Sequence, residues 1–368
     1  MAYRFKLNES FEEGFRRIAF EQRDRVESQL RSPNEHAVAV HETRKALKRL
    51  RALLRLVRPT LREHVFGEEN AHLREIARIL SGARDRHVLL ETVIKLEGAC
   101  GPAAKGAGDT LREILQTANG GNTPNVDAAA IQLALERLAV AEERFSELRL
   151  IGRGFEAIGP GLEASYRKGR RTFRGAYAEG TDDNFHEWRK SVQQHWRHMM
   201  LLSNAWPDYF AARVSEARGL SQIVGGDHDL ALLKAFVRAE PTGRISAAQA
   251  NTIEKLARQR QKQLRAMAQP MGVRLYAEGA KGLHRRMARY WQSAVARKEQ
   301  EPEKAPPSKG GEGKAQARAA AFKLSTQTQP EARIDQGQGG AHLPHHEVPV
   351  RQSQSSIPRH REEQKMDK

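Results

Sequence analysis

The sequence has one cysteine, few aromatic residues and no long apolar run. Cys100 cannot form a disulfide within the chain, and no cysteine or histidine pair has the spacing of a zinc site. No stretch of about eighteen apolar residues exists, and the N-terminal segment lacks the apolar centre of a signal peptide. We therefore expect a cytoplasmic protein, in a reducing compartment, without disulfides or a membrane span.

Positive charge, in contrast, is abundant. The 368 residues carry a formal net charge of +17 at pH 7, with a pI of about 10.2. A 39% hydrophobic content is enough for one large core or two ordinary ones. Such a charge favours a polyanionic partner over a neutral small substrate. Nucleic acid, an anionic membrane surface and inorganic polyphosphate are the candidates.

Helical periodicity extends through most of the chain. Apolar residues recur three and four positions apart, as in Phe11, Phe15 and Ile18, which predicts an all-α protein. Its helices should be about ten to twenty-five residues long. Breaks are expected at clusters of Gly, Pro, Asn and Ser, namely 32–34, 98–108, 119–124, 159–161, 180–183 and 225–226. Residues 297–368 are rich in Gln, Pro, Gly, Ser and Glu and predict a disordered, low-complexity tail.

One predicted helix is strongly basic. Residues 41–58 read HETRKALKRLRALLRLVR, and at about 100° per residue most of the cations fall within a sector of about 140°, opposite the leucines. Glu42 is the only acid in this stretch, so like charges three and four positions apart repel by a few tenths of a kcal/mol per pair. Either this is a basic solvated face, or an anionic ligand offsets the repulsion.

Two motifs recur later in the chain in the same order. Residues 186–190 (HEWRK) repeat residues 41–45 (HETRK) at an offset of 145. Residues 225–229 (GGDHD) echo residues 81–85 (SGARD) at an offset of 144. The recurrence indicates duplication of a helical unit. The second copy has fewer cations, so the two basic surfaces are not equivalent.

The two HxxRK motifs and the Gly-x-x-Asp segments at 82–85 and 226–229 resemble the CHAD family, the conserved histidine α-helical domain. The resemblance covers residues 5–296, with halves of about 5–150 and 151–296. It implies two pseudo-symmetric four-helix bundles with a basic central groove or pore. It also implies binding of inorganic polyphosphate without catalysis. The family is often fused to a triphosphate-tunnel (CYTH) catalytic domain; its paired Glu-x-Glu strand motif does not occur in residues 1–296, so we expect a stand-alone binder.

The chemistry of polyphosphate is consistent with these residue types. The polymer offers oxygen acceptors but no bases, so its site needs arginine forks and lysine point charges above all. If the motif histidines contact phosphate, affinity should rise as the pH falls through about 6.5. The segment 165–174 (SYRKGRRTFR) adds a basic face that is either a binding surface or a solvated one. The predicted polyphosphate-binding residues are His41, Arg44, Lys45, Lys48, Arg51, Arg55, His186, Arg189, Lys190, Arg197, Arg167, Lys168, Arg171 and Arg174.

Other roles for the histidines and aspartates need weighing. His41 and His186 have no histidine or carboxylate four residues later, so a metal site is not expected, but each could be a buried structural histidine. Asp85 and Asp229 have no metal partner or base beside them, so we expect them to cap helices or orient Arg and His side chains. The HLPHH motif of residues 342–346 is not expected to bind metal. No cofactor is expected.

Two other classes of function remain open. Nonspecific RNA or DNA binding would use the same charge, although no helix-turn-helix, RNP or zinc-finger signature is present and aromatics are only 6%. Alternatively, the protein is a scaffold that recruits proteins of phosphate metabolism to polyphosphate granules, with the tail as the contact. An enzyme acting on phosphoanhydrides would need carboxylates or a nucleophile, and only Glu42 and Glu187 accompany the motif cations. Catalysis is therefore not expected.

Overall fold

The computed structural model describes residues 3–31, 36–80, 85–117, 128–240 and 244–300. Every regular element in these ranges is helical and none is a β-strand, so the predicted all-α class is confirmed. None of these helices is long and apolar enough to cross a membrane. The eleven α-helices of the described residues are α1 (Phe11–Arg31), α2 (His36–Val57), α3 (Glu63–Ile79), α4 (Asp85–Cys100), α5 (Pro102–Thr117), α6 (Ala128–Glu147), α7 (Gly159–Glu179), α8 (Asp182–Leu201), α9 (Pro207–Ala239), α10 (Ala247–Leu275) and α11 (Ala280–Gln300).

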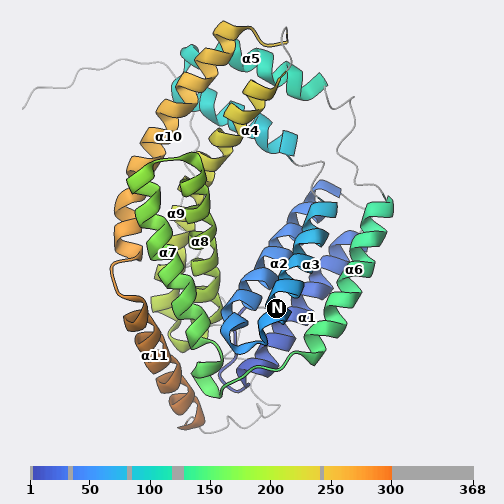
Figure 1. Ribbon diagram of the computed structural model, residues 1–368, viewed down its shortest axis with the longest axis vertical. Helices are drawn as coiled ribbons and strands as arrows, with labels where there is room; N and C mark the ends of the chain where they lie inside the picture. The colour runs from blue at the N-terminus through green and yellow to red at the C-terminus, as the bar shows by residue number, and fades with distance from the viewer. Residues whose placement is uncertain (1–2, 32–35, 81–84, 118–127, 241–243, 301–368) are drawn as a thin grey trace, which may run out of the picture. The chain divides into compact units, whose positions relative to one another are not determined.

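Helices α1, α2, α3 and α6 lie side by side as a four-helix bundle (Figure 1). Their apolar faces meet in a core that includes Phe15, Ile18, Leu50, Leu53 and Phe145, all fully buried. The leucines of α2 recur three and four positions apart, so they gather on one face of the helix. The opposite, cationic face of α2 is thereby left for other contacts.

The hairpin of α4 and α5 packs on α9 and α10 instead of on this bundle (Figure 1). These four helices share a second core, which includes Val93, Leu111, Leu233 and Ile253. The first repeat thus contributes two helices to a bundle whose other two helices belong to the second repeat. Beyond residue 300, the predicted tail lies outside the described residues.

Helices α7, α8, α9 and α10 form the bundle of the second repeat, with α11 packed along α7. Two buried or half-buried tyrosines of α7 fasten it to α10. The hydroxyl of Tyr166 donates to the carbonyl oxygen of Leu275 at 2.9 Å, and that of Tyr177 donates to the carbonyl oxygen of Arg265 at 2.7 Å. Each bond joins segments far apart in sequence, so the bundle closes by side-chain to backbone contacts as well as by apolar packing.

Helix α2 is where the two repeats meet. His198 on α8 is fully buried, and its Nε2 donates to the carbonyl oxygen of Ala52 at 2.9 Å. Gly161 on α7 lies so close to α2 that an added Cβ would be 1.8 Å from the carbonyl oxygen of Leu56. A side chain at Gly161 would therefore force the two helices apart. The face of α2 opposite its own bundle is covered by the second repeat.

The repeat is also visible in the order of the helices, but one predicted break is wrong. Helix α8 corresponds to α2, whereas α9 runs without interruption through Gly225-Gly226 and has 33 residues, more than expected. The Gly-x-x-Asp segment at 226–229 is therefore helical. Residues 81–84 of the first repeat lie outside the described residues. Each glycine costs about 1 kcal/mol relative to alanine. Packing of α9 between α8 and α10 offsets this cost.

Other predicted breaks agree with the structure more closely. α7 ends before Gly180, which has a left-handed φ of 70°, and α8 begins at Asp182. The expected break at 159–161 falls slightly earlier, since these residues already form the first turn of α7. A break was predicted over residues 98–108, and in the structure it consists of Gly101 between α4 and α5.

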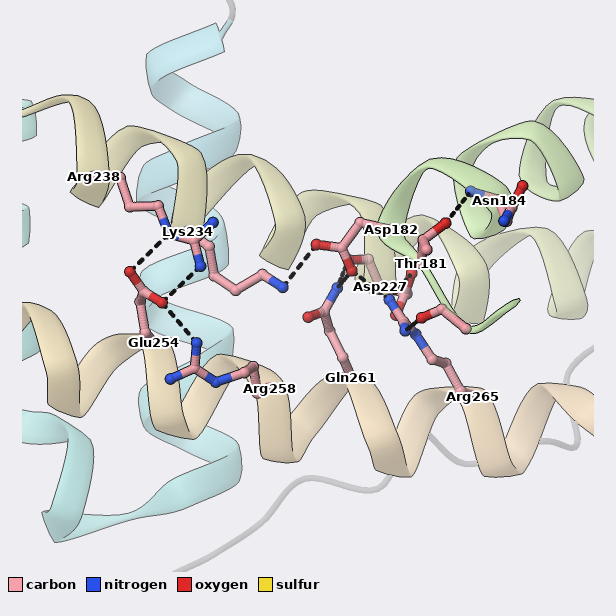
Figure 2. A network of polar contacts seen from close by, with 11 residues as sticks. Thr181, Asp182, Asn184, Asp227, Lys234, Arg238, Glu254, Arg258, Gln261 and Arg265 are labelled. Atoms are coloured by element: carbon pink, nitrogen blue, oxygen red, sulfur yellow. Dashed lines mark hydrogen bonds and ion pairs between the residues drawn. The ribbon is translucent and has the colours of Figure 1, made fainter. Parts of the chain in front are cut away.

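A network of ion pairs holds the start of α8 against α9 and α10 (Figure 2). Asp182 accepts hydrogen bonds from Lys234 at 2.7 Å and from Arg265 at 2.5 Å. Arg265 also donates from Nε to the buried Asp227 at 2.6 Å, and Gln261 donates to the Asp227 carbonyl oxygen at 3.0 Å. Burial raises the pKa of Asp227 although Arg265 opposes the rise. The network fixes the end of α8 that carries the second HxxRK motif.

Candidate functional site

A basic cavity of about 400 Å³ lies where α2 and α3 face α7 and α8. The C-terminal half of α2 and the N-terminal half of α8 contribute most of its wall. Neither repeat forms it alone. The lining residues are Lys48, Arg51, Ala52, Arg55, Asn70, Arg74, Lys168, Arg189, Lys190, Ser191, Gln193, Gln194 and Arg197.

Helix α2 supplies three of the cations, about one turn apart. Arg51 donates from Nε to Oδ1 of Asn70 on α3 at 3.2 Å, which holds its guanidinium against the wall. Burial, reinforced by repulsion from Arg55 and Arg74, lowers the pKa of Arg51 to about 10. Burial and repulsion from Arg74 also lower the pKa of Arg55. Both arginines stay charged at neutral pH, and both would be stabilised by an anion.

Helices α7 and α8 supply the opposite wall. Arg197 is buried, and this burial lowers its pKa to about 10. Its Nη1 donates to the carbonyl oxygen of Gln193 at 2.6 Å, while its guanidinium lies 4.3 Å from the ring centroid of Trp196. Burial also lowers the pKa of Lys168; Glu187 opposes the shift and Lys190 adds to it. Arg197 is therefore held in place by neutral groups, whereas Lys168 and Lys190 both lie near the carboxylate of Glu187.

Acidic residues are scarce around the cavity. No carboxylate is among its described lining residues, whereas eight lysines and arginines are. Glu187 is the acid that pairs with this wall: it accepts a hydrogen bond from Lys190 and lies 3.9 Å from Lys168. Mutual repulsion of eight cations in one partly desolvated space is costly, and an anionic ligand would relieve it.

The other polar groups of the wall are neutral. Asn70, Ser191, Gln193 and Gln194 offer amides and a hydroxyl, and Gln194 donates from Nε2 to Ser165 Oγ at 3.0 Å. No aromatic ring is among the described lining residues. Amides and cations can bind phosphate oxygens, but this wall has no ring on which a nucleobase could stack.

The structure brings half of the sequence-predicted site residues into this cavity. Arg197 comes from the last turns of α8 and the others from α2, α7 and the start of α8. The predicted residues that line the cavity are Lys48, Arg51, Arg55, Lys168, Arg189, Lys190 and Arg197.

The remaining predicted residues lie elsewhere. On the N-terminal half of α2, His41 and Lys45 are exposed and Arg44 is half-buried. Lys45 bonds to Glu42 at 2.6 Å, so it has an intramolecular partner. On α7, the exposed predicted residues include Arg167, Arg171 and Arg174. Arg167 pairs with Glu163. These residues lie on helices that form the cavity but are not part of its lining.

Arg74 is a lining cation that the sequence analysis does not single out. It lies on α3, outside both HxxRK helices, and its charge lowers the pKa values of Arg51 and Arg55. At the 144-residue offset, Arg74 corresponds to Arg218 on α9. Recurrence of a cation at this position is the signal that could have found it.

His186 is half-buried against a second histidine rather than in the cavity lining. Its Nδ1 lies 3.1 Å from Nδ1 of His228, and the two ring centroids are 4.1 Å apart. Burial, together with the charges of Lys190 and Arg189, lowers the pKa of His186, and burial lowers that of His228 to about 4. Each ring therefore gains a proton at a lower pH than a free imidazole does, so a pH response from His186 is expected below 6.5 rather than at it.

Of the two roles expected for Asp229, the helix cap is wrong, because Asp229 lies in the interior of α9. The orientation of Arg and His side chains stays a prediction for both aspartates. Asp85 is the first residue of α4, and its side chain, like Gly82, lies outside what the structure describes. Among the described residues, no group of three or more histidines, cysteines or acids could hold a metal ion.

Comparisons with known proteins place the chain in a family. Residues 17–238, more than half of its length, match the model of the CHAD domain. Among solved structures, PptA from Streptomyces chartreusis is similar, with a TM-score of 0.48 and 16% identity, over 73% of this chain and 100% of that one. No curated protein matches. The domain match over residues 17–238, together with the two HxxRK motifs of this chain, shows that the chain belongs to the CHAD family.

Proposed function

We propose that this protein binds inorganic polyphosphate in the basic cavity, and that it does so without catalysis. The observation that carries the proposal is a wall of eight lysines and arginines from both repeats with no carboxylate among its described residues. Membership of the CHAD family supports it, because that resemblance implies polyphosphate binding. A polymer of phosphates supplies the dense negative charge that such a wall requires.

The lining favours polyphosphate over nucleic acid. Its amides and cations match phosphate oxygens, and the described lining contains no ring to stack a base. A cavity of about 400 Å³ is in the range of small-ligand sites. It therefore suits a bare, narrow phosphate chain better than a strand with bases attached.

The cations divide into two groups in this proposal. The eight cations of the cavity wall contact the polyphosphate directly. The exposed ones on α2 and α7 extend the positive field, and together with His41 and His186 they bind stretches of long polyphosphate that leave the cavity. Because the pKa of His186 is lowered, any gain of affinity from its protonation comes below pH 6.5.

Cellular roles follow from the binding activity. We propose that the protein works in the cytoplasm, at polyphosphate granules, where long chains are accessible. A protein partner that contacts the C-terminal tail, and nonspecific nucleic-acid binding, are compatible with this role but not required by the cavity.

A competition titration on the full chain tests the proposal. Labelled long-chain polyphosphate would be competed with single-stranded RNA, duplex DNA and short phosphates at one moderate salt concentration. We expect polyphosphate to bind about a hundredfold more tightly than either nucleic acid, roughly 2.7 kcal/mol. Equal competition by RNA or DNA would show a generic polyanion surface and would reject the proposal.

A pair of charge-reversal variants locates the site. Lys48→Glu with Arg55→Glu removes two lining cations and should weaken polyphosphate binding by about a hundredfold or more, since each charged hydrogen bond is worth about 1.5–3 kcal/mol. The control is Lys105→Glu with Lys255→Glu, an equal change of net charge at exposed positions outside the cavity. Equal losses in the two double variants would contradict the assignment to this cavity.

A further inference from the structure

A second cavity, of about 480 Å³, lies between α1, α2, α8 and α9. Arg4, Arg25 and Arg49 line it, and no carboxylate is among its described lining residues. Unlike the basic cavity, it also has an aliphatic wall, which includes Met200 and Val214. Cations and aliphatic side chains therefore face the same space.

The duplication relates this cavity to the basic one. At the offset of 145 residues, Met200 corresponds to Arg55, and Arg49 corresponds to Gln194. Arg55 and Gln194 line the basic cavity, and their counterparts Met200 and Arg49 line the second cavity. Some positions of the second cavity are therefore counterparts of positions in the first, although Lys48 and Gln193, another pair at this offset, both line the basic cavity.

Two of the counterpart positions are more apolar in the second cavity, whereas Arg49 is a cation where the basic cavity has Gln194. Met200 takes the position of Arg55, and Val214 takes that of Asn70 at the offset of 144. Trp196 on α8 takes the position of Arg51 and packs against the core. The second cavity thus combines aliphatic residues of α8 and α9 with arginines of α1 and α2.

The arginines of this cavity repel one another. Arg49 is half-buried, and burial with repulsion from Arg25 lowers its pKa, while Glu42 outside the lining opposes the shift. Nη1 of Arg49 donates to the neutral Gln22 Oε1 at 3.3 Å. An anion placed between Arg25 and Arg49 would relieve their repulsion, as in the first cavity.

We propose that the second cavity binds an amphiphilic anion, with a phosphate or carboxylate head at Arg25 and Arg49 and an aliphatic chain on Met200 and Val214. Small-ligand sites are typically apolar with a few converging polar groups, and a methionine wall adapts its shape to a flexible chain. The rings of Tyr3 and Phe210 are buried, so the accessible wall is aliphatic and offers no stacking surface. An acyl or alkyl chain therefore fits better than a nucleobase.

Calorimetric titration of the full chain with octyl phosphate, below its aggregation concentration, tests this inference. We expect octyl phosphate to bind at least tenfold more tightly than inorganic phosphate, and octanoate to bind more tightly than acetate. Met200→Arg, which installs the counterpart residue, should abolish the preference for the alkyl chain. Arg49→Gln, also a counterpart residue, should weaken both the alkylated and the plain anion. Val214→Asn provides an independent test of the aliphatic wall should Met200→Arg fail to fold.

The mirror variant Arg55→Met is the matched control. It should weaken polyphosphate binding but leave octyl phosphate binding unchanged, while Met200→Arg should leave polyphosphate binding unchanged. The inference is overturned if octyl phosphate binds no more tightly than inorganic phosphate. It is equally overturned if Arg55→Met, rather than Met200→Arg, removes the alkyl preference, because the ligand would then occupy the basic cavity. Neither result depends on whether polyphosphate is the ligand of the first cavity.

Discussion

Helices α2 and α8 occupy equivalent places in the two repeats, yet they serve the basic cavity with different residues. In α8 the HxxRK motif itself lines the wall, through Arg189 and Lys190. In α2 the motif lies outside the lining, and the cavity uses Lys48, Arg51 and Arg55 one to three turns later. The C-terminal half of α2 faces residues from both halves of α8 in this cavity, and Ala52 contacts His198 near the end of α8. A motif repeated in sequence therefore need not have the same role in both copies.

The difference also shows why the second copy has fewer cations. Residues of α2 and α8 line both cavities, with Arg49 and Met200 in the second one. Keeping cations at every repeated position would add like-charge repulsion to both. In α8, Trp196 and Met200 instead pack against the hydrophobic core. Charge is thus concentrated in one cavity, and the other has become partly apolar.

The largest effect that we predict concerns the buried faces of these two helices. At the 145-residue offset, His195 and His198 of α8 correspond to Leu50 and Leu53 of α2. Burial lowers the pKa of His195 well below its usual range and that of His198 to about 4. The unfolded chain binds protons near pH 6.5 and the folded chain does not, so stability is complete above that pH and falls toward pH 4. For His198 the loss is on the order of 3 kcal/mol.

Urea unfolding at a series of pH values checks this prediction. His198→Leu, which installs the residue of α2, should make the loss of unfolding free energy between pH 7 and 4 smaller by about the contribution of His198. Its stability at pH 7 reports separately on the lost bond to the Ala52 carbonyl oxygen. A pH dependence identical to that of the wild type would show that His198 is not responsible.

A slightly smaller effect should come from the ligand of the basic cavity. The buried cations there repel one another, so polyphosphate should bind the folded state and stabilise it. At a concentration of one hundred times the Kd, the gain is about 2.7 kcal/mol, or roughly 5–10 °C in Tm. Thermal unfolding with and without polyphosphate measures it. The Lys48→Glu, Arg55→Glu variant should show almost no shift at the same concentration, and an undiminished shift would break the contrast between the two cavities.

The smallest predicted effect compares one residue of each repeat. Arg74 lines the basic cavity, whereas its counterpart Arg218 lies 5.7 Å from the ring centroid of Trp196. Arg74→Ala should weaken polyphosphate binding by about tenfold, close to 1.4 kcal/mol, whereas Arg218→Ala should change it by less than about twofold. The salt dependence should also differ, because losing one phosphate contact reduces the log–log slope by about 0.7. Equal effects of the two changes would show that the cavity does not distinguish the repeats.

Much of the fold could be predicted from local patterns. Apolar spacing identified helices such as α1 and α2, and the repeated HxxRK motif identified the duplication. The site was predicted only in part, since seven lining cations lie on the predicted basic segments but Arg74 does not. Gly225-Gly226 was misinterpreted as a break because local propensity favours one there, while packing on both sides of α9 favours helix.

By itself, the sequence determined the all-helical class, the duplication and the excess of positive charge, because these depend on local periodicity and composition. Only the tertiary structure decided which cations meet, since α2 and α8 approach each other through a contact 146 residues apart, from His198 to Ala52. It also decided that His186 packs against His228, outside the cavity lining. The tertiary structure also forms the second cavity, and no sequence motif predicts its aliphatic wall.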